Sequence, residues 1–140
     1  MSTLLISPLK IPAAEYAPGV CNIGPAEIGR RRRAGHVGLG ITIVAGALLL
    51  ALGPPAWWRL ILFLPAYIGA VGYLQAFFHF CVGFASRGVY NFDALDPEHW
   101  RKVVDEAARA ADKRKSLQIG LISLVIGLAV ALAAVALPIA

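Results

Sequence analysis

The chain has 140 residues, of which 59% are hydrophobic and only 15% are charged, and its formal net charge is +5. These proportions exclude an ordinary water-soluble domain, because too few polar residues remain to cover its surface. They are typical of a small integral membrane protein that carries its charges in a few short segments. We therefore expect an all-α membrane protein.

Residues 1–35 form the first segment, which has prolines at positions 8, 12 and 18. Prolines spaced this closely deny the chain a regular helix, and the segment has no clean apolar core of the signal-peptide type. It is therefore predicted to be an extended cytoplasmic arm without a cleaved signal peptide. An arm of this kind becomes ordered only if a surface or a partner holds it.

Four consecutive arginines lie near the end of this arm: Arg30, Arg31, Arg32 and Arg33. A basic run can bind nucleic acid, but a DNA-reading protein needs a folded module to carry its base contacts, and neither the arm nor the later loop resembles one. A basic cluster beside a membrane span instead gains about 1 kcal/mol per residue from anionic lipids. The arginines are therefore predicted to contact lipid headgroups, and no nucleic-acid partner is expected.

Three apolar runs follow, at residues 36–53, 60–85 and 117–140. At about 1.5 Å of helical rise per residue, each crosses or nearly crosses a hydrocarbon core of about 30 Å. The short segment between the first two runs allows only a helical hairpin turn, with Trp57 and Trp58 at the level of the headgroups. The prediction is a transmembrane hairpin over 36–85 and a third transmembrane helix over 117–140.

The basic residues are divided very unevenly between the two sides of such a membrane protein. Five lie in residues 1–35 and seven in residues 86–116, whereas only Arg59 lies in the hairpin turn. By the positive-inside rule, the arm and the 86–116 loop are cytoplasmic and the C-terminus is outside. The expected location is the bacterial inner (cytoplasmic) membrane.

The 86–116 loop contains a helical pattern over residues 96–115. Asp96 fits an N-cap with Pro97 at the first helical position. An apolar stripe at helical spacing follows: Trp100, Val103, Val104, Ala107, Ala108 and Ala111. We expect one cytoplasmic amphipathic helix at the membrane interface. Its stripe packs on the chain's own bundle, or docks through Trp100, Val103 and Val104 on the membrane surface or on a neighbouring subunit.

One face of the second run is small or polar. It consists of Gly72, Gln75, His79 and Gly83. Such faces are typical of helix–helix contacts in membranes, so Gly72 and Gln75 are candidate interaction residues. His79 is either a hydrogen-bonding residue of this seam or, as the candidate cofactor-binding residue, an axial ligand to haem or a chlorophyll-type pigment. No cofactor is required by the pattern.

Catalytic and metal-binding patterns are not recognisable in the sequence. All eight acidic residues lie outside the three apolar runs, which argues against a proton or ion relay across the membrane. Cys21 and Cys81 are too few for a zinc framework, and a cytoplasmic location argues against a stable disulfide. We therefore expect no catalytic residue, no metal site and no enzymatic activity.

Residues 22–92 carry several short motifs in a fixed order. They are NIG at residues 22–24, the acidic Glu27, Arg31, the run GLGITIVAGALLLALG, and the closing FHFCVG that contains Cys81. This series resembles the YgaP-like inner-membrane domain, a transmembrane hairpin that occurs alone or joined to rhodanese-type sulfurtransferases. The resemblance implies a hairpin that associates with other membrane helices. Because the chain contains no rhodanese domain, the resemblance carries no sulfur-transfer reaction over to it.

Two classes of function fit these features. The first is a small, non-catalytic accessory or assembly subunit that stabilises a larger complex of membrane protein subunits. The second is a self-associating bundle, a homo-oligomer that binds a haem or pigment cofactor or takes part in the trafficking of sulfur compounds. The many contact surfaces and the absence of a polar pathway favour the first.

Overall fold

The computed structural model describes residues 16–138. The elements are, in chain order, α2 (Pro25–Leu52), η1 (Ala56–Leu62), α3 (Phe63–Phe78), α4 (Val82–Arg87), β1 (Val89–Tyr90), η2 (Pro97–His99), β2 (Arg101–Lys102) and α5 (Glu106–Ala136). Three helical stretches are long and apolar enough to cross a membrane: Pro25–Leu52, Ala56–Phe78 and Glu106–Ala136. This confirms the predicted helical fold with three helices that could span a membrane by their length and composition.

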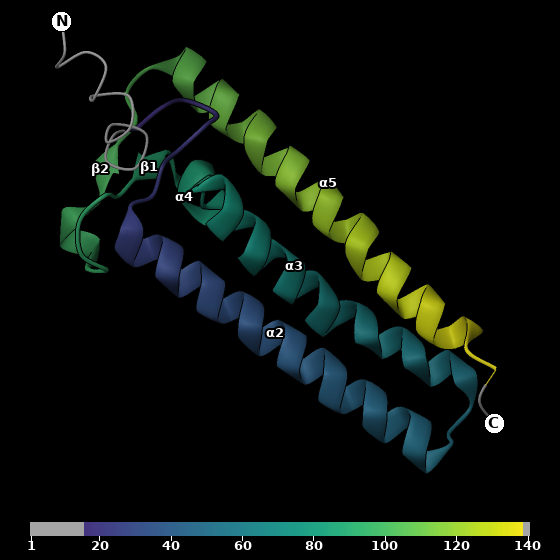
Figure 1. Ribbon diagram of the computed structural model, residues 1–140. Coiled ribbons are helices and arrows are strands. Elements are labelled where there is room, and N and C mark those ends of the chain that lie inside the picture. The colour runs from purple at the N-terminus through teal and green to yellow at the C-terminus, as the bar shows by residue number, and fades with distance from the viewer. Residues whose placement is uncertain (1–15, 139–140) are drawn as a thin grey trace, which may run out of the picture.

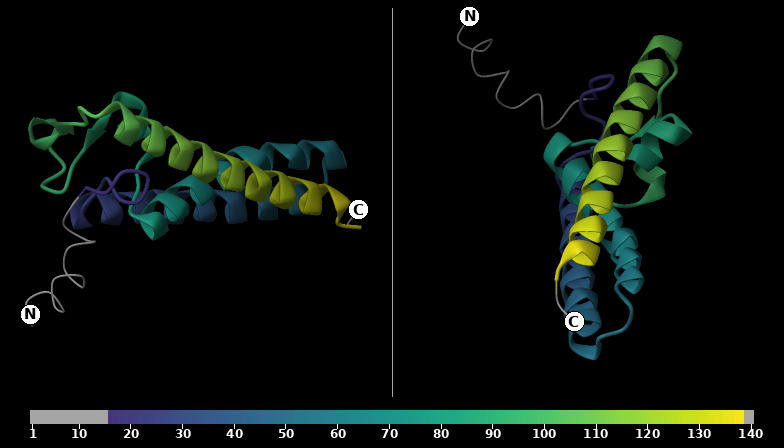
Figure 2. Two further views of the ribbon diagram at one scale, coloured as in Figure 1. Left: turned by 90° about the horizontal axis from the view of Figure 1, so that it is seen from above. Right: turned by 90° about the vertical axis from the view of Figure 1, so that its right-hand side faces the viewer.

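The three long helices lie side by side with α3 in the middle (Figure 1). Helices α2 and α5 each pack along α3 and have little contact with each other. The result is an elongated molecule with two distinct ends (Figure 2). We call the end that holds residues 16–33 and 79–116 the polar end, and the opposite end, around η1 and the last turn of α5, the hairpin end.

Glycines bring α2 and α3 close together, as helices in lipid require. A Cβ atom added to Gly38 would lie 2.5 Å from the Cα of Gly69, and one added to Gly72 would lie 2.6 Å from the backbone nitrogen of Gly35. No side chain fits at these positions. The predicted small-residue contact is therefore present within this chain, and Gly72 is buried against α2 instead of being available to a partner.

Helix α5 packs on α3 through its own narrow face of small residues. Gly127 lies against Phe63 and Tyr67 of α3, and Ser123 and Ala131 are buried on the same face. At the hairpin end, the buried Arg59 donates hydrogen bonds to the carbonyl oxygens of Ala134 (3.0 Å) and Leu137 (3.1 Å). These carbonyls lie at the C-terminal end of α5, where the helix dipole is negative, so a cation suits them.

The first apolar helix begins earlier than the hydropathy pattern predicted. Residues 25–35 were expected to belong to an extended arm, but α2 begins at Pro25, so all four consecutive arginines are helical. Proline is favoured in the first turn of a helix because its missing N–H has no partner there, and Glu27 in that turn complements the helix dipole. Prolines 8 and 12 of the predicted arm lie outside the described residues.

The second run is not one helix. It was predicted to continue to residue 85, but α3 ends at Phe78, His79 takes a left-handed conformation (φ 54°, ψ 43°), and α4 starts at Val82. The break accommodates another segment, since the backbone N–H of Asn22 donates to the carbonyl of His79 (3.1 Å). An isolated helix would have no reason to break there.

The predicted amphipathic helix over residues 96–115 is wrong as a single element. Pro97–His99 forms one turn of 3₁₀ helix, and Arg101–Lys102 pairs antiparallel with Val89–Tyr90. Asp105, not Asp96, is the N-cap, because its carboxylate accepts from the backbone N–H of Ala108 (3.1 Å). From there one continuous helix, α5, runs to Ala136, so the third span has no boundary at residue 117.

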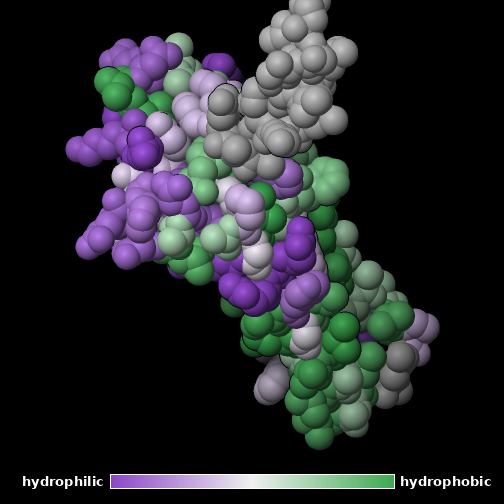
Figure 3. Space-filling view, turned by 60° about the vertical axis from the view of Figure 1, so that its left-hand side comes forward, coloured by the Kyte–Doolittle hydropathy of each residue, from purple (hydrophilic) through white to green (hydrophobic). Residues whose placement is uncertain are grey.

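The outward faces of the long helices are apolar and exposed. On α2 they include Val37, Ile41, Ile43, Val44 and Leu48, and on α5 Leu117, Leu121, Val125, Leu128 and Leu132. A soluble protein of this size rarely exposes so much contiguous apolar surface. Hydrophilic residues instead gather at the polar end, while hydrophobic residues cover most of the remaining face in view (Figure 3).

Candidate functional site

A group of buried polar side chains lies at the polar end, where the segment before α2 passes between the end of α3 and the loop after β1. We call this group the polar junction; it consists of Asn22, Glu27, Arg31, Gln75, Cys81 and Asn91. Asn22, Glu27 and Asn91 are fully buried. Buried polar groups persist only when they are hydrogen-bonded, so their contacts define what the junction does.

Asn22 joins three separate segments. Its side-chain amide accepts from the backbone N–H of Cys81 (2.7 Å) and donates to the carbonyl of the same residue (3.1 Å). Its backbone carbonyl accepts from the N–H of Asn91 (3.0 Å), whose carbonyl in turn accepts from Gly24 (2.9 Å). Asn22 thus satisfies the backbone groups that the break between α3 and α4 leaves without a helical partner.

Among the described residues, Glu27 is the one charged member of the polar junction that is fully buried. One carboxylate oxygen accepts from the Nδ2 of Asn91 (3.3 Å), and the other lies 3.4 Å from an Nη of Arg31 and 3.9 Å from an Nη of Arg30. Two guanidinium groups therefore face one carboxylate. The charge of the buried Glu27 is neutralised, and the local balance remains positive.

Arg31 reaches across the junction to Cys81. Its Nη2 donates to the Sγ of Cys81 (2.8 Å), and its guanidinium carbon lies 5.7 Å from the ring centre of Phe84. The side chain of Arg31 is 15% exposed, compared with 52% for Arg30. Of the four arginines that were predicted to contact lipid headgroups, Arg30, Arg32 and Arg33 are exposed, whereas Arg31 is turned inward.

The segment before α2 is also held by α5. The hydroxyl of Tyr16 donates to Asp112 (2.7 Å), and the backbone N–H of Gly19 donates to the second oxygen of the same carboxylate (2.8 Å). The Tyr16 ring stacks on Tyr90, with ring centres 4.6 Å apart. Burial, together with the neighbouring Asp112, raises the pKa of the Tyr16 phenol above its usual range, so the phenol stays protonated and continues to donate.

Cys21 lies in the same segment and is buried. Its thiol lies 3.6 Å from the carbonyl oxygen of Ile23, which it can reach as a weak donor. Burial raises the pKa of this thiol, because a thiolate would lose its hydration there. Cys21 and Cys81 are not joined by a disulfide, and the buried Cys21 packs as a small hydrophobic residue.

The structure does not place His79 and Gln75 together in a helix–helix seam. His79 ends α3 and is half-buried, and no hydrogen bond from its imidazole reaches any other residue between 16 and 138. Gln75 instead accepts from the backbone N–H of Val82 (2.8 Å) and so caps the start of α4. The two residues therefore have separate structural roles within this chain.

The three residues of the predicted docking stripe face different environments. Trp100 packs on Phe84 (ring centres 4.8 Å apart) and lies under the guanidinium of Arg87. Val103 is buried, with 3% exposure, whereas Val104 is 86% exposed. Only Val104 of the three is free to contact a membrane surface or another subunit.

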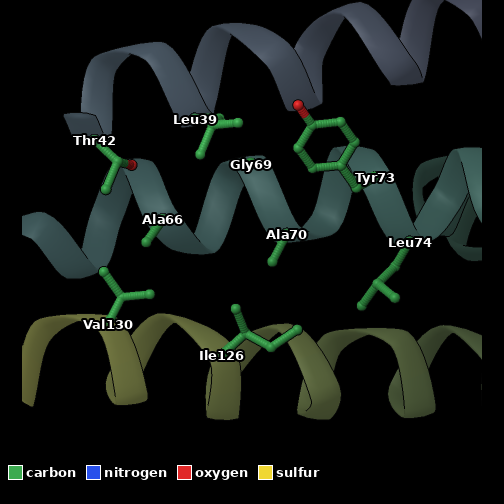
Figure 4. A pocket seen from close by; sticks show the side chains of 9 residues that line it. All are labelled: Leu39, Thr42, Ala66, Gly69, Ala70, Tyr73, Leu74, Ile126 and Val130. Atoms are coloured by element: carbon green, nitrogen blue, oxygen red, sulfur yellow. The ribbon is translucent and has the colours of Figure 1, made fainter. Parts of the chain in front are cut away.

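A second feature is an apolar groove between α2 and α5. Its floor is the surface of α3, where Ala66, Gly69 and Ala70 are small, and its walls include Leu39 on one side and Ile126 and Val130 on the other (Figure 4). The cavity has a volume of about 230 Å³. Near its polar end the hydroxyl of Tyr73 points toward α2 and lies 2.6 Å from the Nδ1 of His36.

The residues of the polar junction were only partly foreseeable. The NIG motif and Glu27 and Arg31 stood out in the sequence, but nothing local indicated that Asn91 and Asp112 would be buried partners. The chain has few polar residues close to its apolar runs, and Asn91 and Asp112 are among them. This scarcity is the signal that could have pointed to them. Among residues 16–138, no group of three or more histidine, cysteine or acidic side chains is arranged to hold a metal ion.

Comparisons with protein-family models, with curated proteins and with solved structures gave no match. The resemblance of residues 22–92 to the YgaP-like domain therefore stays a prediction.

Proposed function

We propose that this chain is a small, non-catalytic membrane protein that acts as an accessory or assembly subunit of a larger membrane protein complex. The observation that carries the proposal is the apolar groove over α3. Helices α2 and α5 lie on either side of α3 and leave a groove between them, whose floor on α3 consists of the small residues Ala66, Gly69 and Ala70. Floors of this kind let a further transmembrane helix approach closely, and close packing is what drives helix association in lipid.

The polar junction supports the same proposal. It fixes the break between α3 and α4 and joins the segment before α2 to Asn91, and thus holds α2, α3 and α4 in one arrangement. A rigid scaffold binds a partner helix with less loss of conformational entropy than a mobile one.

The test is gentle extraction of the tagged chain from its native membrane, followed by native mass measurement. A stoichiometric complex with other membrane subunits is the expected result. Ile126→Trp should fill the groove and release the partner, whereas the matched change Val125→Trp, on the neighbouring outward-facing residue, should leave the complex intact. Loss of the partner with both variants, or with neither, would contradict docking in the groove.

A self-associating bundle with a bound pigment is the second candidate. It would give a homo-oligomer with a visible absorption band in the same experiment. The observation that favours this candidate is the half-buried His79 at the end of α3, whose imidazole makes no hydrogen bond to another residue between 16 and 138. A colourless hetero-complex would exclude it.

We also propose that the polar end faces the cytoplasm of a bacterial cell, with the hairpin end outside the inner membrane. The uneven distribution of Lys and Arg supports this orientation, and the arrangement of the helices supports a common side for residues 16–33 and 79–116. Reporter fusions at Ala140 test it. A fusion that is active only in the cytoplasm would overturn the orientation.

A further inference from the structure

A pocket at the polar end lies against the α2–α3 seam and opens beside the polar junction. It has a volume of about 370 Å³. One end is polar, with Arg31, Gln75 and Cys81, and the other is lined by apolar groups of α3, among them Ile68 and Val71. The pocket is therefore amphipathic along its length. We call it the seam pocket.

The polar end of the seam pocket is lined by one charged residue, Arg31, and the charge around it is positive because the exposed Arg30 shares the carboxylate of Glu27 with it. Arg30 and Arg31 both lie within 4 Å of the single carboxylate of Glu27. The Nε–H of Arg31 is buried and has no acceptor among the described residues. A guanidinium group matches the geometry of a phosphate and binds it through paired hydrogen bonds. The chemistry of this end thus suits a phosphate oxygen.

The seam pocket extends along α3 from Tyr67 to Gln75, which corresponds to about 12 Å of helical rise. Arg31 lies where the charged start of α2 gives way to its apolar stretch, which is the level of the headgroups if the helices cross a membrane. A bound molecule would place its charge at that level and its tail along the hydrocarbon. Free phosphate would use only one end of this space.

We infer that the seam pocket binds one anionic phospholipid, with its phosphate on Arg31 and part of an acyl chain against Ile68 and Val71. This inference rests on the proposed membrane insertion of the chain with the polar end at the headgroup level. It goes beyond a diffuse attraction of exposed arginines to lipid, because it assigns the affinity to one inward-turned arginine. The exposed Arg32 then contributes little to retention of this lipid.

The test uses the full chain, purified in mild detergent and titrated with dioleoyl phosphatidylglycerol or dioleoyl phosphatidylcholine, with native mass spectrometry as the readout. The wild type should retain one phosphatidylglycerol at least tenfold better than phosphatidylcholine. The double variant Glu27→Gln/Arg31→Gln keeps the net charge of the chain and leaves an amide oxygen for Asn91, so its fold should be preserved. It should lose the tenfold preference.

Two further variants separate a specific site from surface charge. Arg32→Gln lowers the net charge by one but leaves the seam pocket intact, so retention should stay within about twofold of the wild type. Val71→Trp fills the apolar part without changing charge, and should lower retention about tenfold. Equal loss in Arg32→Gln and in the double variant would overturn the inference, and so would unchanged retention in Val71→Trp.

Inorganic phosphate distinguishes the two sources of the anion. Phosphatidylglycerol should remain bound in the presence of an equal concentration of inorganic phosphate, because the acyl chain contributes to its binding. Displacement at that concentration would overturn the assignment to a lipid. If the chain does not insert into vesicles at all, the proposed membrane function fails; if it inserts but retains no lipid, only this inference fails.

Discussion

Asn22 and Cys81 are 59 residues apart in sequence, yet the side-chain amide of Asn22 pairs with both the N–H and the carbonyl of Cys81, at 2.7 and 3.1 Å. Both residues are buried. The amide of Asn22 thus makes with Cys81 the two hydrogen bonds that the backbone of a neighbouring strand would otherwise make. This replacement is what allows the helical path to break between α3 and α4 inside an otherwise apolar run.

Asn22→Ala should therefore destabilise the protein. It leaves two buried backbone groups of Cys81 without partners, and each such loss costs about 1–3 kcal/mol, so a decrease of about 2–6 kcal/mol in the free energy of unfolding is expected. Thermal unfolding in detergent measures the change. Equal stability of Asn22→Ala and the wild type would contradict the pairing.

The α2–α3 contact predicts a contrast between two glycines of one helix. Gly38→Ala places a methyl group 2.5 Å from the backbone of Gly69 and should cost about 1–3 kcal/mol, because the helices must separate. At Gly40 an added Cβ meets nothing within 4 Å. Gly40→Ala should therefore be neutral or stabilising by up to about 1 kcal/mol. Thermal unfolding of the two variants under identical conditions checks the contrast, and equal effects would refute it.

The left-handed backbone at His79 predicts an unusual stabilising change. A non-glycine residue in this conformation costs about 1–2 kcal/mol. His79→Gly should therefore raise the free energy of unfolding by about 1 kcal/mol, whereas His79→Val, whose branched side chain suits this conformation worst, should lower it. The absorption spectra of the same proteins test the pigment hypothesis. A visible band in the wild type that disappears in both variants would identify His79 as a ligand.

The contact between Tyr16 and Asp112 predicts a pH dependence. The pKa of the Tyr16 phenol is raised in the folded chain, whereas the unfolded chain loses this proton near pH 10. Stability from this contact is therefore complete below about pH 10 and is lost as the pH rises further. The raised pKa of the Cys21 thiol acts in the same direction from about pH 8.5, so the measurement belongs in a Cys21→Ala background.

In that background, Tyr16→Phe should remove the decline in stability above pH 10 and lower stability at neutral pH by about 1 kcal/mol, the usual value for one hydrogen bond. Denaturant unfolding at pH 7 and at several values up to pH 11 provides the measurement. A decline that persists unchanged in Tyr16→Phe would show that other groups cause it.

Val103 and Val104 are neighbours with opposite exposure, so the same substitution should act differently at each. Val103→Asp buries a carboxylate without a partner and should cost about 3 kcal/mol or more. Val104→Asp should change stability by no more than about 0.5 kcal/mol. If Val104 contacts a membrane surface or another subunit, Val104→Asp should still weaken that association in a co-purification assay. Unchanged association would exclude a docking role for this residue.

The sequence was sufficient to predict the three long apolar helices, because runs of that length have no other stable arrangement in a bilayer. It also indicated the glycine faces that now lie between α2 and α3. The break at His79 could not be predicted, since no proline or glycine marks it and the hydropathy is unchanged across it. Its cause is the insertion of Asn22, which is distant in sequence.

The start of α5 shows a second limit of local patterns. Asp96 followed by Pro97 is a good local signal for a helix start, yet Asp105 provides the cap. The competing influence is tertiary: residues 101–102 pair with β1, and the N–H of Val103 donates to Gly88 (2.7 Å). These contacts hold the chain extended until residue 105. Buried partners such as Asp112 become visible only once this pairing is known.

Helix α5 has 31 residues, about 46 Å of helical rise, and therefore exceeds the hydrocarbon thickness by about 16 Å. Asp112 anchors one end of it to Gly19, and its last carbonyls accept from Arg59 at the other. Because both anchors belong to one continuous helix, the rotation of α5 about its axis sets the direction of both anchors together. Inserting one residue near Gly127 would turn them about 100° relative to each other, so both anchors cannot be kept. The number of residues in α5 therefore sets the relative orientation of the polar end and the hairpin end.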